Sequence, residues 1–349
     1  MRKIININNR KIGTGYPVYI IAEMSANHNQ DFDQAVRIIE AAKEAGADAI
    51  KLQTYSPDTM TIDVHNKFFQ IKGTIWDGKS LYDLYGEAYT PWEWQPKLQK
   101  IAEELKLDLF STPFDQTAVD YLDRFNMPAY KIASFELVDL PLIRHIAKTS
   151  KPVIMSTGLA SLAEIDEAVK VFRETGGEQI ALLKCTSAYP ASPEEMNLRT
   201  IPNLAETFDV PVGLSDHSFC FEAAIAAVAL GACIVEKHFT LSRDARGPDS
   251  SFSVEPDELK VMVKAIRNTE KAFGSVNYET TECEKSSTVF RRSLFVVKDM
   301  KANSEFTEEN VRSIRPGFGL HTRHMGEVLG RKSKKGIAKG TPLDWDLIV

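Results

Sequence analysis

Short non-polar runs alternate with longer amphipathic segments along most of this chain. Eight of the runs carry, at or next to their last position, a polar residue able to do chemistry. Non-polar runs of about four to eight residues are typical of strands in a parallel sheet that is buried on both faces. The predicted strands are Val18–Glu23, Ala49–Thr54, Asp108–Thr112, Ala129–Ser134, Pro152–Thr157, Ile180–Thr186, Val210–His217 and Cys233–Phe239.

Amphipathic segments between these runs have the spacing of helices. In Asp31–Gly46, non-polar residues recur on one helical face, and Gly46 ends the segment. Ser161 and Glu164 match a capping box. Further helices are predicted at Ala118–Phe125, Leu140–Thr149, Ser161–Thr175, Ser218–Leu230 and Pro256–Phe273. Eight β–α units in series favour a closed (β/α)₈ TIM barrel, a fold whose chemistry lies at the C-terminal strand ends.

Two segments interrupt this pattern within the barrel region. Ile4–Tyr16 alternates weakly and predicts a small hairpin that closes the bottom of the barrel. Tyr55–Trp94 adds about forty residues after the second strand, including Trp76 and Tyr85. A long aromatic loop on this side of a barrel favours a lid or wall of a substrate pocket. The alternative is a structural excursion with its own small core.

The remaining residues predict a second, smaller domain. The chain has 349 residues, about 100 more than a typical barrel. We expect a barrel with its hairpin at 1–275, a polar linker at 276–288 and a compact β-rich domain at 289–349. About sixty residues are close to the lower limit for an independent core, so this domain is expected to dock against another surface.

Composition limits the classes of function. With 43% hydrophobic and 26% charged residues, the chain is typical of a soluble globular protein. A net charge of −6 excludes a general nucleic-acid footprint. We find no signal-peptide core and no membrane-span candidate. The four cysteines show no CxxC spacing, which favours reduced thiols in the cytoplasm.

His217 and His238 are the candidate metal ligands. They end two strands that are neighbours in a barrel, about 4.8 Å apart, so both imidazoles could bind one ion. By strand alternation, Ser215 shares a face with His217, and Glu236 shares a face with His238. Nitrogen and oxygen ligands suit Mn²⁺, Mg²⁺, Co²⁺, Fe²⁺ or Zn²⁺. The alternative is a pair of hydrogen-bonded core histidines.

Lysines and hydroxyls at other strand ends indicate an anion site. Lys51 and Lys131 end non-polar strands, where an unpaired ammonium group is costly. Bound phosphate or carboxylate would satisfy them; pairing with Glu23 or Glu136 is the alternative. The accompanying hydroxyl residues are Thr112, Ser134, Ser156 and Ser215.

Several other polar residues follow the strands. Glu23 could act as a general base, hold a sugar hydroxyl or pair with Lys51. Asn27 could orient substrate or only shape its loop. Asp249, in Gly247-Pro-Asp249, could bind a substrate hydroxyl or a metal-bound water. Arg315, in an Arg-Pro-Gly turn of the second domain, presents a guanidinium group.

The motifs taken together resemble the sialic acid synthase family. The resemblance covers nearly the whole chain, including a C-terminal segment similar to the antifreeze-like (SAF) domain. It is carried by Ala22-Glu23…Asn27-His28, Lys51-Leu-Gln53, Ser111-Thr-Pro113, Lys131-Ile-Ala-Ser134…Glu136, Met155-Ser-Thr-Gly158, Cys185-Thr186…Tyr189-Pro190, Gly213-Leu-Ser-Asp-His217, Glu236-Lys-His-Phe239, Gly247-Pro-Asp249 and Arg315-Pro-Gly317.

The resemblance implies a transferase that condenses phosphoenolpyruvate with an N-acyl amino sugar and water, releasing phosphate. It implies a divalent metal on His217 and His238, with Mn²⁺ expected first and Mg²⁺ or Co²⁺ possible. Glu23 and Asp249 would join the two histidines in catalysis. It also implies a domain-swapped homodimer. Phosphoenolpyruvate would contact Lys51, Thr112, Lys131, Ser134, Ser156 and Ser215. The sugar would contact Asn27, Gln53, Glu136, Tyr189 and the partner subunit's Arg315.

Departures from the family pattern bear on the sugar. Ser187 stands where sialic acid synthases usually have Asn, and Phe135 stands where they usually have Gly. The segments Ser25–Gln30 and Trp76–Trp94 resemble the pseudaminic acid synthase branch, which uses a 6-deoxy-2,4-diacetamido hexose of L-altro configuration. Alternatives are an N-acetylneuraminate or legionaminate synthase, a metal-dependent or Schiff-base pyruvate aldolase, and a non-catalytic carbohydrate- or ice-binding protein.

Overall fold

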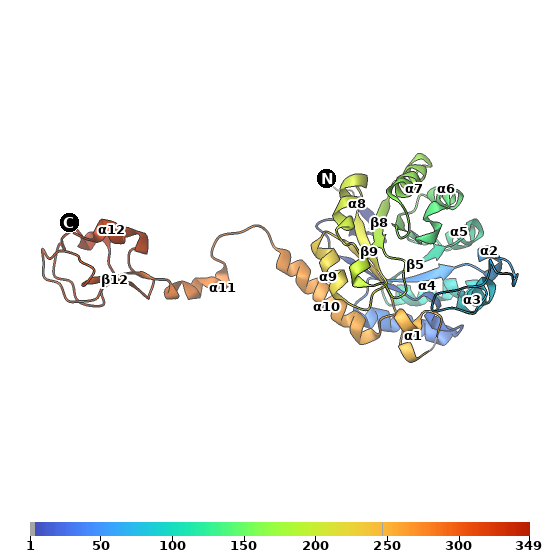
Figure 1. Ribbon diagram of the computed structural model, residues 1–349, viewed down its shortest axis with the longest axis horizontal. Coiled ribbons are helices and arrows are strands. Elements are labelled where there is room, and N and C mark those ends of the chain that lie inside the picture. Colours follow the sequence, from blue (N-terminus) through green and yellow to red (C-terminus); the bar gives the residue numbers. More distant parts are fainter. Residues whose placement is uncertain (1–3, 246) are drawn as a thin grey trace. The chain divides into compact units, whose positions relative to one another are not determined.

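The computed structural model describes residues 4–245 and 247–349. The chain divides into two compact units, Met1–Gly274 and Ser275–Val349. In the first unit, eight parallel strands form a closed barrel in the order β10-β3-β4-β5-β6-β7-β8-β9. Helices surround these strands (Figure 1). The predicted (β/α)₈ barrel is therefore confirmed.

Each barrel strand lies inside a predicted run, except that β5 extends one residue beyond its run. The hydrogen-bonded register pairs Glu23 of β3 with His238 of β10, so the chemically able ends of the first and last strands meet. The strands are β3 (Tyr19–Glu23), β4 (Ala49–Thr54), β5 (Asp108–Pro113), β6 (Tyr130–Ile132), β7 (Val153–Ser156), β8 (Ile180–Cys185), β9 (Val212–Asp216) and β10 (Ile234–His238).

The helices begin and end at local signals in the sequence. Asp31 caps α1 by accepting a hydrogen bond from Gln34 N, and Gly46 ends it with φ 92°. The capping box of Ser161 and Glu164 is confirmed at α7. The helices around the barrel are α1 (Phe32–Ala45), α4 (Gln95–Glu104), α5 (Gln116–Asp123), α6 (Leu140–Ala147), α7 (Leu162–Glu174), α8 (Thr200–Phe208), α9 (Glu222–Ala229) and α10 (Pro256–Phe273).

Helix α9 corrects one predicted boundary. The pattern predicts a helix from Ser218, but α9 begins at Glu222. The Lys237 ammonium group donates hydrogen bonds to the carbonyl oxygens of Ser218 and Cys220, at 2.6 and 3.4 Å. Carbonyls held by this tertiary contact shape a loop in place of the first helical turn, which periodicity alone does not reveal.

The predicted hairpin closes one end of the barrel. Strands β1 (Ile5–Ile7) and β2 (Arg10–Ile12) pair antiparallel. Ile5, Ile7 and Ile12 are buried in one cluster with inward-facing barrel residues such as Tyr19 and Phe110. The intervening residues of the same strands belong to the separate core between barrel and helices. Alternation along each strand thus gives the molecule two non-polar layers.

The Tyr55–Trp94 segment, called the insertion below, contains two short helices. They are α2 (Pro57–Met60) and α3 (Leu81–Ala88). Its aromatic residues have different roles. The indole of Trp94 packs edge-on against His28 and Phe32, with ring centroids 5.5 Å apart in both contacts. Trp76 and Tyr85 instead line the large pocket described below.

The second unit contains a small core of its own. Strands β11 (Ser293–Val296) and β12 (Val311–Ile314) pair antiparallel, and isolated bridges such as Met300↔Ile337 extend the β structure. The core includes Leu294, Phe306 and Val328, the last in α12 (Met325–Val328). Within the segment expected to be a linker, the structure has the one-turn helix α11 (Glu282–Lys285), which continues into the 3₁₀ helix η7 (Ser286–Phe290). No helix in the described part of the chain is long and non-polar enough to span a membrane.

Candidate active site

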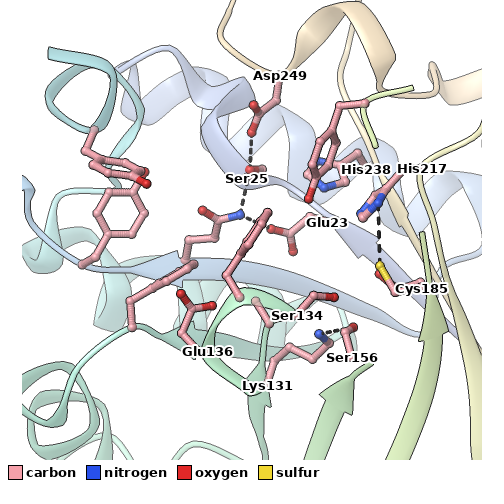
Figure 2. Close-up of a pocket in the computed structure, with 18 of the residues that line it drawn as sticks. Glu23, Ser25, Lys131, Ser134, Glu136, Ser156, Cys185, His217, His238 and Asp249 are labelled. Carbon is pink, nitrogen blue, oxygen red and sulfur yellow. Dashed lines mark hydrogen bonds between the residues drawn. The ribbon is translucent and has the colours of Figure 1, made fainter. Parts of the chain in front are cut away.

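A pocket of about 350 Å³ opens at the C-terminal ends of the barrel strands. Figure 2 shows side chains from many strands converging on it. Such a volume is ordinary for a small-molecule site. Of the residues predicted to carry chemistry, those lining it are Glu23, Lys51, Gln53, Lys131, Ser134, Glu136, Ser156, Tyr189, Ser215, His217, His238 and Asp249.

Two buried lysines lie between two buried carboxylates. Lys51 Nζ is 2.8 Å from Glu23 and 3.6 Å from Glu236, and Lys131 Nζ is 3.9 Å from Glu236. The sequence had left open a pairing of Lys51 with Glu23, and the structure contains it. With both carboxylates ionised, these four groups carry no net charge. Protonation of one carboxylate would leave the floor of the pocket positive and suited to an anion.

The pKa shifts indicate which carboxylate takes that proton. Burial, opposed by the charge of Lys51, raises the pKa of Glu23 from 4.5 to about 7. Burial also acts on Glu236, but the two lysines outweigh it and lower the pKa of Glu236. Burial lowers the pKa of Lys131, whereas the carboxylates outweigh burial at Lys51 and raise its pKa. Glu23 is therefore the carboxylate closest to gaining a proton near neutral pH.

The predicted hydroxyl residues surround the lysines. Lys131 Nζ donates to Ser156 Oγ at 2.6 Å, and Ser134 Oγ accepts from the backbone N–H of Gly158 at 3.1 Å. Ser215 Oγ donates to Glu236 at 3.3 Å. Thr112 differs: it accepts from Lys51 Nζ at 3.1 Å but is fully buried and does not line the pocket. In this structure it supports Lys51 from behind.

A chain of hydrogen bonds links two acidic residues from distant parts of the sequence. Gln53 Nε2 donates to Glu23 and to Ser25 Oγ, at 2.8 Å in each case. Ser25 Oγ in turn donates to Asp249 (Figure 2). Burial raises the pKa of Asp249, and its contacts with Ser25 and Ala26 oppose the rise. Gln53 and Ser25 therefore hold Glu23 and Asp249 in a fixed relation.

His217 and His238 lie side by side, as the sequence predicts. Their ring centroids are 5.3 Å apart. His217 Nδ1 lies 3.0 Å from the carbonyl oxygen of Thr186 and 3.8 Å from Cys185 Sγ. His238 Nδ1 is buried without a hydrogen-bond partner among the described residues.

This arrangement fits a metal held by two protein ligands. An unpaired buried imidazole nitrogen is costly unless something binds it. Within the described residues, however, no group of three or more His, Cys, Asp or Glu side chains is placed to hold an ion. A metal here would therefore keep open positions for water and substrate, as a catalytic site requires.

A buried ion pair supports the histidines from behind. Asp216 and Lys237 are direct neighbours in the register of β9 and β10, each preceding one histidine. Lys237 Nζ lies 2.7 Å from Asp216 Oδ2, and both side chains are almost fully buried. Asp216 points away from the pocket, as strand alternation predicts. The pair ties together the two strand ends that present His217 and His238.

Asn27 requires a correction. The sequence places it among residues that contact the sugar, but it is fully buried and does not line the pocket. Its amide donates to Phe239 O and Ser253 Oγ, at 3.0 and 2.9 Å, and accepts from Ser250 Oγ at 3.1 Å. Asn27 therefore ties the loop after β3 to the loop after β10, because all its polar capacity is used internally.

Arg315 lies in the second unit. It is exposed, and its guanidinium carbon is 6.0 Å from the Phe290 ring centroid. It lies on the turn that the sequence predicts, after β12. Its contact with a sugar in a partner subunit stays a prediction.

Several residues that line the pocket were not predicted as site residues. Ser25 belongs to the segment Ser25–Gln30 and Cys185 to the motif Cys185-Thr186, but neither was assigned a role. Phe252, from the loop after β10, contacts His238 and Tyr189, with ring centroids 5.0 and 4.9 Å apart. The inward face of β8 could have revealed Cys185, because Ala181, Leu183 and Cys185 alternate along it. No local pattern marks Phe252.

Comparison with known proteins identifies the family of this chain. A model described as the NeuB family matches residues 38–278, and a model described as the SAF domain matches residues 291–349. The chain belongs to the NeuB family. The resemblance to sialic acid synthases is thereby confirmed, and so is the antifreeze-like segment.

Individual relatives differ in similarity. A pseudaminic acid synthase of Campylobacter jejuni (strain NCTC 11168) is 47% identical over 95% of this chain and 96% of its own length. An N,N'-diacetyllegionaminic acid synthase of the same strain is 37% identical over 90% of this chain and 96% of its own length. The solved structure of the Bacillus subtilis spore coat polysaccharide biosynthesis protein SpsE is 36% identical, covers 99% of both chains and gives a TM-score of 0.68.

Proposed function

We propose that this protein is a pseudaminic acid synthase. It condenses phosphoenolpyruvate with 2,4-diacetamido-2,4,6-trideoxy-β-L-altropyranose and water to give pseudaminic acid and phosphate. The observation that carries the proposal is the set of strand-end side chains, with two lysines, a protonatable carboxylate and a histidine pair in one pocket. The contrast between two enzymes of one bacterium, 47% against 37% identity, favours this sugar over the legionaminate precursor.

Phosphoenolpyruvate binds at the lysine end of the pocket. Its carboxylate and phosphate groups accept hydrogen bonds from Lys51 and Lys131, and Ser134, Ser156 and Ser215 complete the shell. Because Glu23 and Glu236 already neutralise the lysines, anion binding is strongest when Glu23 holds a proton. The lysines are fixed before substrate arrives, so they stabilise charge in the transition state without reorganising.

His217 and His238 hold the divalent metal in this proposal, with Mn²⁺ the expected ion. A metal bound there would act as a Lewis acid that polarises the acceptor carbonyl. The unpaired Nδ1 of His238 supports this placement. The Thr186 carbonyl beside His217 Nδ1 fixes the orientation of that ring and leaves its other nitrogen for the ion.

Glu23 moves the protons of the reaction. As C3 of phosphoenolpyruvate forms a bond with the aldehyde carbon of the open-chain sugar, protonated Glu23 gives its proton to the aldehyde oxygen. The resulting carboxylate then takes a proton from the water that adds at C2. Finally the bond between C2 and the phosphate oxygen breaks, and phosphate leaves with the proton of the C2 hydroxyl. Glu23 ends protonated, as it began, and its raised pKa suits both transfers.

We further propose that the enzyme works in the cytoplasm as a domain-swapped homodimer. The small second unit would cap the partner's barrel, so that Arg315 of one subunit reaches the sugar of the other. Its exposed position on a turn supports such a contact. Sedimentation tests the dimer. Mixing of two inactive variants tests the shared site: phosphate release should return when Lys131→Met and Arg315→Ala subunits are mixed only if the active site is shared.

Phosphate release is the direct test of the reaction. The enzyme is given phosphoenolpyruvate and Mn²⁺ with the 2,4-diacetamido altrose, with N-acetylmannosamine or with the legionaminate precursor. Turnover of the altrose alone supports the proposal, and turnover of only N-acetylmannosamine or the legionaminate precursor overturns it. Condensation of pyruvate without phosphate release would indicate an aldolase, and inactivation by borohydride with pyruvate would indicate a Schiff base.

Metal binding is tested separately from turnover. Titration of Mn²⁺ by electron paramagnetic resonance should show one tight site in the wild type and weakening by at least tenfold in His238→Gln. His145→Gln is the matched control, since His145 lies on the outer surface beside Asp120. Equal Mn²⁺ affinity in all three proteins would show that this histidine pair does not bind the metal.

A further inference from the structure

The pocket has two ends with different walls. The reactive end contains His217 and His238, and the rings of Tyr189 and Phe252 pack against them. Trp76, from the insertion, closes this end, with its centroid 5.8 Å from that of Tyr189, and its indole N–H donates to Pro248 O at 2.8 Å. Aromatic rings, histidines and the charged strand ends thus meet on one side of the pocket.

The opposite end is lined mainly by aromatic rings. Tyr55, Tyr85 and Phe114 form a cluster there, with the Tyr55 ring centroid 5.7 Å from Tyr85 and 5.1 Å from Phe114. Tyr85 and Glu136 both line the pocket, and burial, and then the charge of Glu136, raises the pKa of Tyr85. In Figure 2, Glu136 is on the far side of the pocket from His217 and His238. We call Tyr55, Tyr85 and Phe114 the non-polar wall.

The chemistry fixes which way the acceptor sugar points. Its aldehyde carbon must meet C3 of phosphoenolpyruvate at the reactive end, where the lysines bind phosphoenolpyruvate and the histidine pair faces the acceptor carbonyl. The carbon atoms farthest from the aldehyde, C5 and C6, therefore extend toward the opposite end. Met60 and Leu84 of the insertion also line the pocket, so the insertion adds mainly non-polar groups around the sugar.

We propose that the non-polar wall binds the C6 methyl group of the acceptor and makes the enzyme reject sugars with a C6 hydroxyl. This inference rests on the proposed function and names the part of the site that selects its substrate. A methyl group against the faces of these rings loses only water, whereas a hydroxyl against the same faces would lose hydrogen bonds that ring carbons cannot replace. A non-polar pocket rejects an added hydroxyl by only about a hundredfold, so we expect a preference of tenfold to a hundredfold.

Two acceptors that differ only at C6 test the proposal. They are 2,4-diacetamido-2,4,6-trideoxy-L-altrose and its 6-hydroxy analogue, 2,4-diacetamido-2,4-dideoxy-L-altrose. The measurement is kcat/KM for each by phosphate release, in the wild type, Tyr85→Gln and Phe114→Gln. Phe114→Gln adds an amide to the wall, and Tyr85→Gln replaces a ring face with an amide, so each variant should reduce the preference for the 6-deoxy sugar by at least about fivefold.

Tyr82→Gln is the matched control. Tyr82 lies on the same helix as Tyr85 but does not line the pocket, and its hydroxyl donates to Asp58 at 3.1 Å. Its preference should equal that of the wild type. Thermal unfolding of all the variants shows whether either wall substitution has damaged the fold. If one of the two wall variants is unfolded, the other one tests the proposal.

The outcomes separate the inference from the proposed function. A wild type that uses neither acceptor contradicts the proposed function itself. A wild type that uses both within twofold keeps the function and overturns the role of the wall. So does a folded Tyr85→Gln or Phe114→Gln variant that retains the full preference. A reduced preference in the wall variants, with none in Tyr82→Gln, supports the assignment.

Discussion

The two ends of the barrel interior have opposite chemistry, although the same strands supply both. On β3, Tyr19 and Ile21 face inward at the closed end, and Glu23 faces inward at the open end. The closed end is sealed by Ile5, Ile7 and Ile12 of the hairpin and needs no charge. A single change of residue type along each strand therefore separates a stabilising core from a reactive pocket.

A second contrast lies across the barrel wall. Lys131 and Lys237 are both almost fully buried lysines on barrel strands. Lys131 faces the pocket beside Ser156, whereas Lys237 faces outward and pairs with Asp216. The first lysine is surrounded by groups that a substrate can share, and the second is satisfied entirely by the protein. Burial of a lysine thus does not by itself indicate function; the side of the strand does.

Lys131→Met should have the largest effect. It removes a fixed cation that stabilises the anionic groups of the reaction, so kcat/KM should fall at least about a thousandfold. Circular dichroism should show an intact barrel, and calorimetry should show lost phosphoenolpyruvate binding. Lys170→Met is the control, because Lys170 is exposed on α7 and pairs only with Asp166. A loss of less than tenfold would contradict the role of Lys131.

Lys237→Met should act on stability. It leaves Asp216 buried without its partner, which costs about 3–5 kcal/mol in the free energy of unfolding. Urea denaturation measures this loss. In the double variant Asp216→Leu/Lys237→Met, part of the stability should return, because no charge is left unpaired, although Ser218 and Cys220 lose hydrogen bonds that the pair provides. If the double variant were as unstable as the single one, the ion pair would not be the cause.

Ile7→Ala should damage the closed end alone. The side chain is fully buried, so the cavity should reduce the free energy of unfolding by about 2–4 kcal/mol. The kcat/KM should stay within about threefold of wild type. Ile4→Ala at a position that is 38% exposed is the control, and it should have little effect on either quantity. A strongly reduced kcat/KM in folded Ile7→Ala would show that the two ends are coupled.

Glu136→Gln should have the smallest effect, and one that depends on pH. Burial raises the pKa of Glu136 from 4.5 to about 7. Between these values the folded protein binds more protons than the unfolded chain, so this group's contribution to stability falls as pH rises. Glutamine cannot ionise. Relative to wild type, the variant should therefore gain on the order of 1–3 kcal/mol between pH 5 and pH 8.

Chemical denaturation at both pH values measures that difference. Glu164→Gln provides the comparison, because Glu164 is exposed and caps α7, and its contacts with Ser161 lower its pKa. Its stability relative to wild type should not improve as pH rises from 5 to 8. If the stability difference between Glu136→Gln and wild type did not change with pH, Glu136 would ionise in the folded protein as it does in the unfolded chain.

Most of the barrel could be predicted because its signals are local. Non-polar runs, helical spacing and caps such as Asp31 and Ser161 depend on neighbouring residues in the chain. Alternation within a strand also places His217 and His238 correctly on the inward face. The late start of α9 could not be predicted in this way, because its cause is Lys237, a residue two elements further along.

Within the site, the positions of residues along the strands could be predicted, but their hydrogen-bond partners could not. Asn27 lies only two residues after Ser25 in the loop that follows β3, yet its amide bonds to the loop after β10, and Ser25 reaches the pocket. Thr112 and Ser156 both end strands, but only Ser156 lines the cavity. A hydroxyl or amide in a loop can turn either way, and the choice depends on which distant groups need a hydrogen bond.

The sequence by itself determined the barrel, the small second domain and the residue types at the strand ends, because periodicity and turn chemistry are short-range. Only the tertiary structure decided that Lys51 pairs with Glu23, that Gln53 and Ser25 link Glu23 to Asp249, and that Tyr55, Tyr85 and Phe114 form one wall. Those contacts join segments separated by many residues. Their geometry is set by closure of the barrel, which no local stretch of sequence contains.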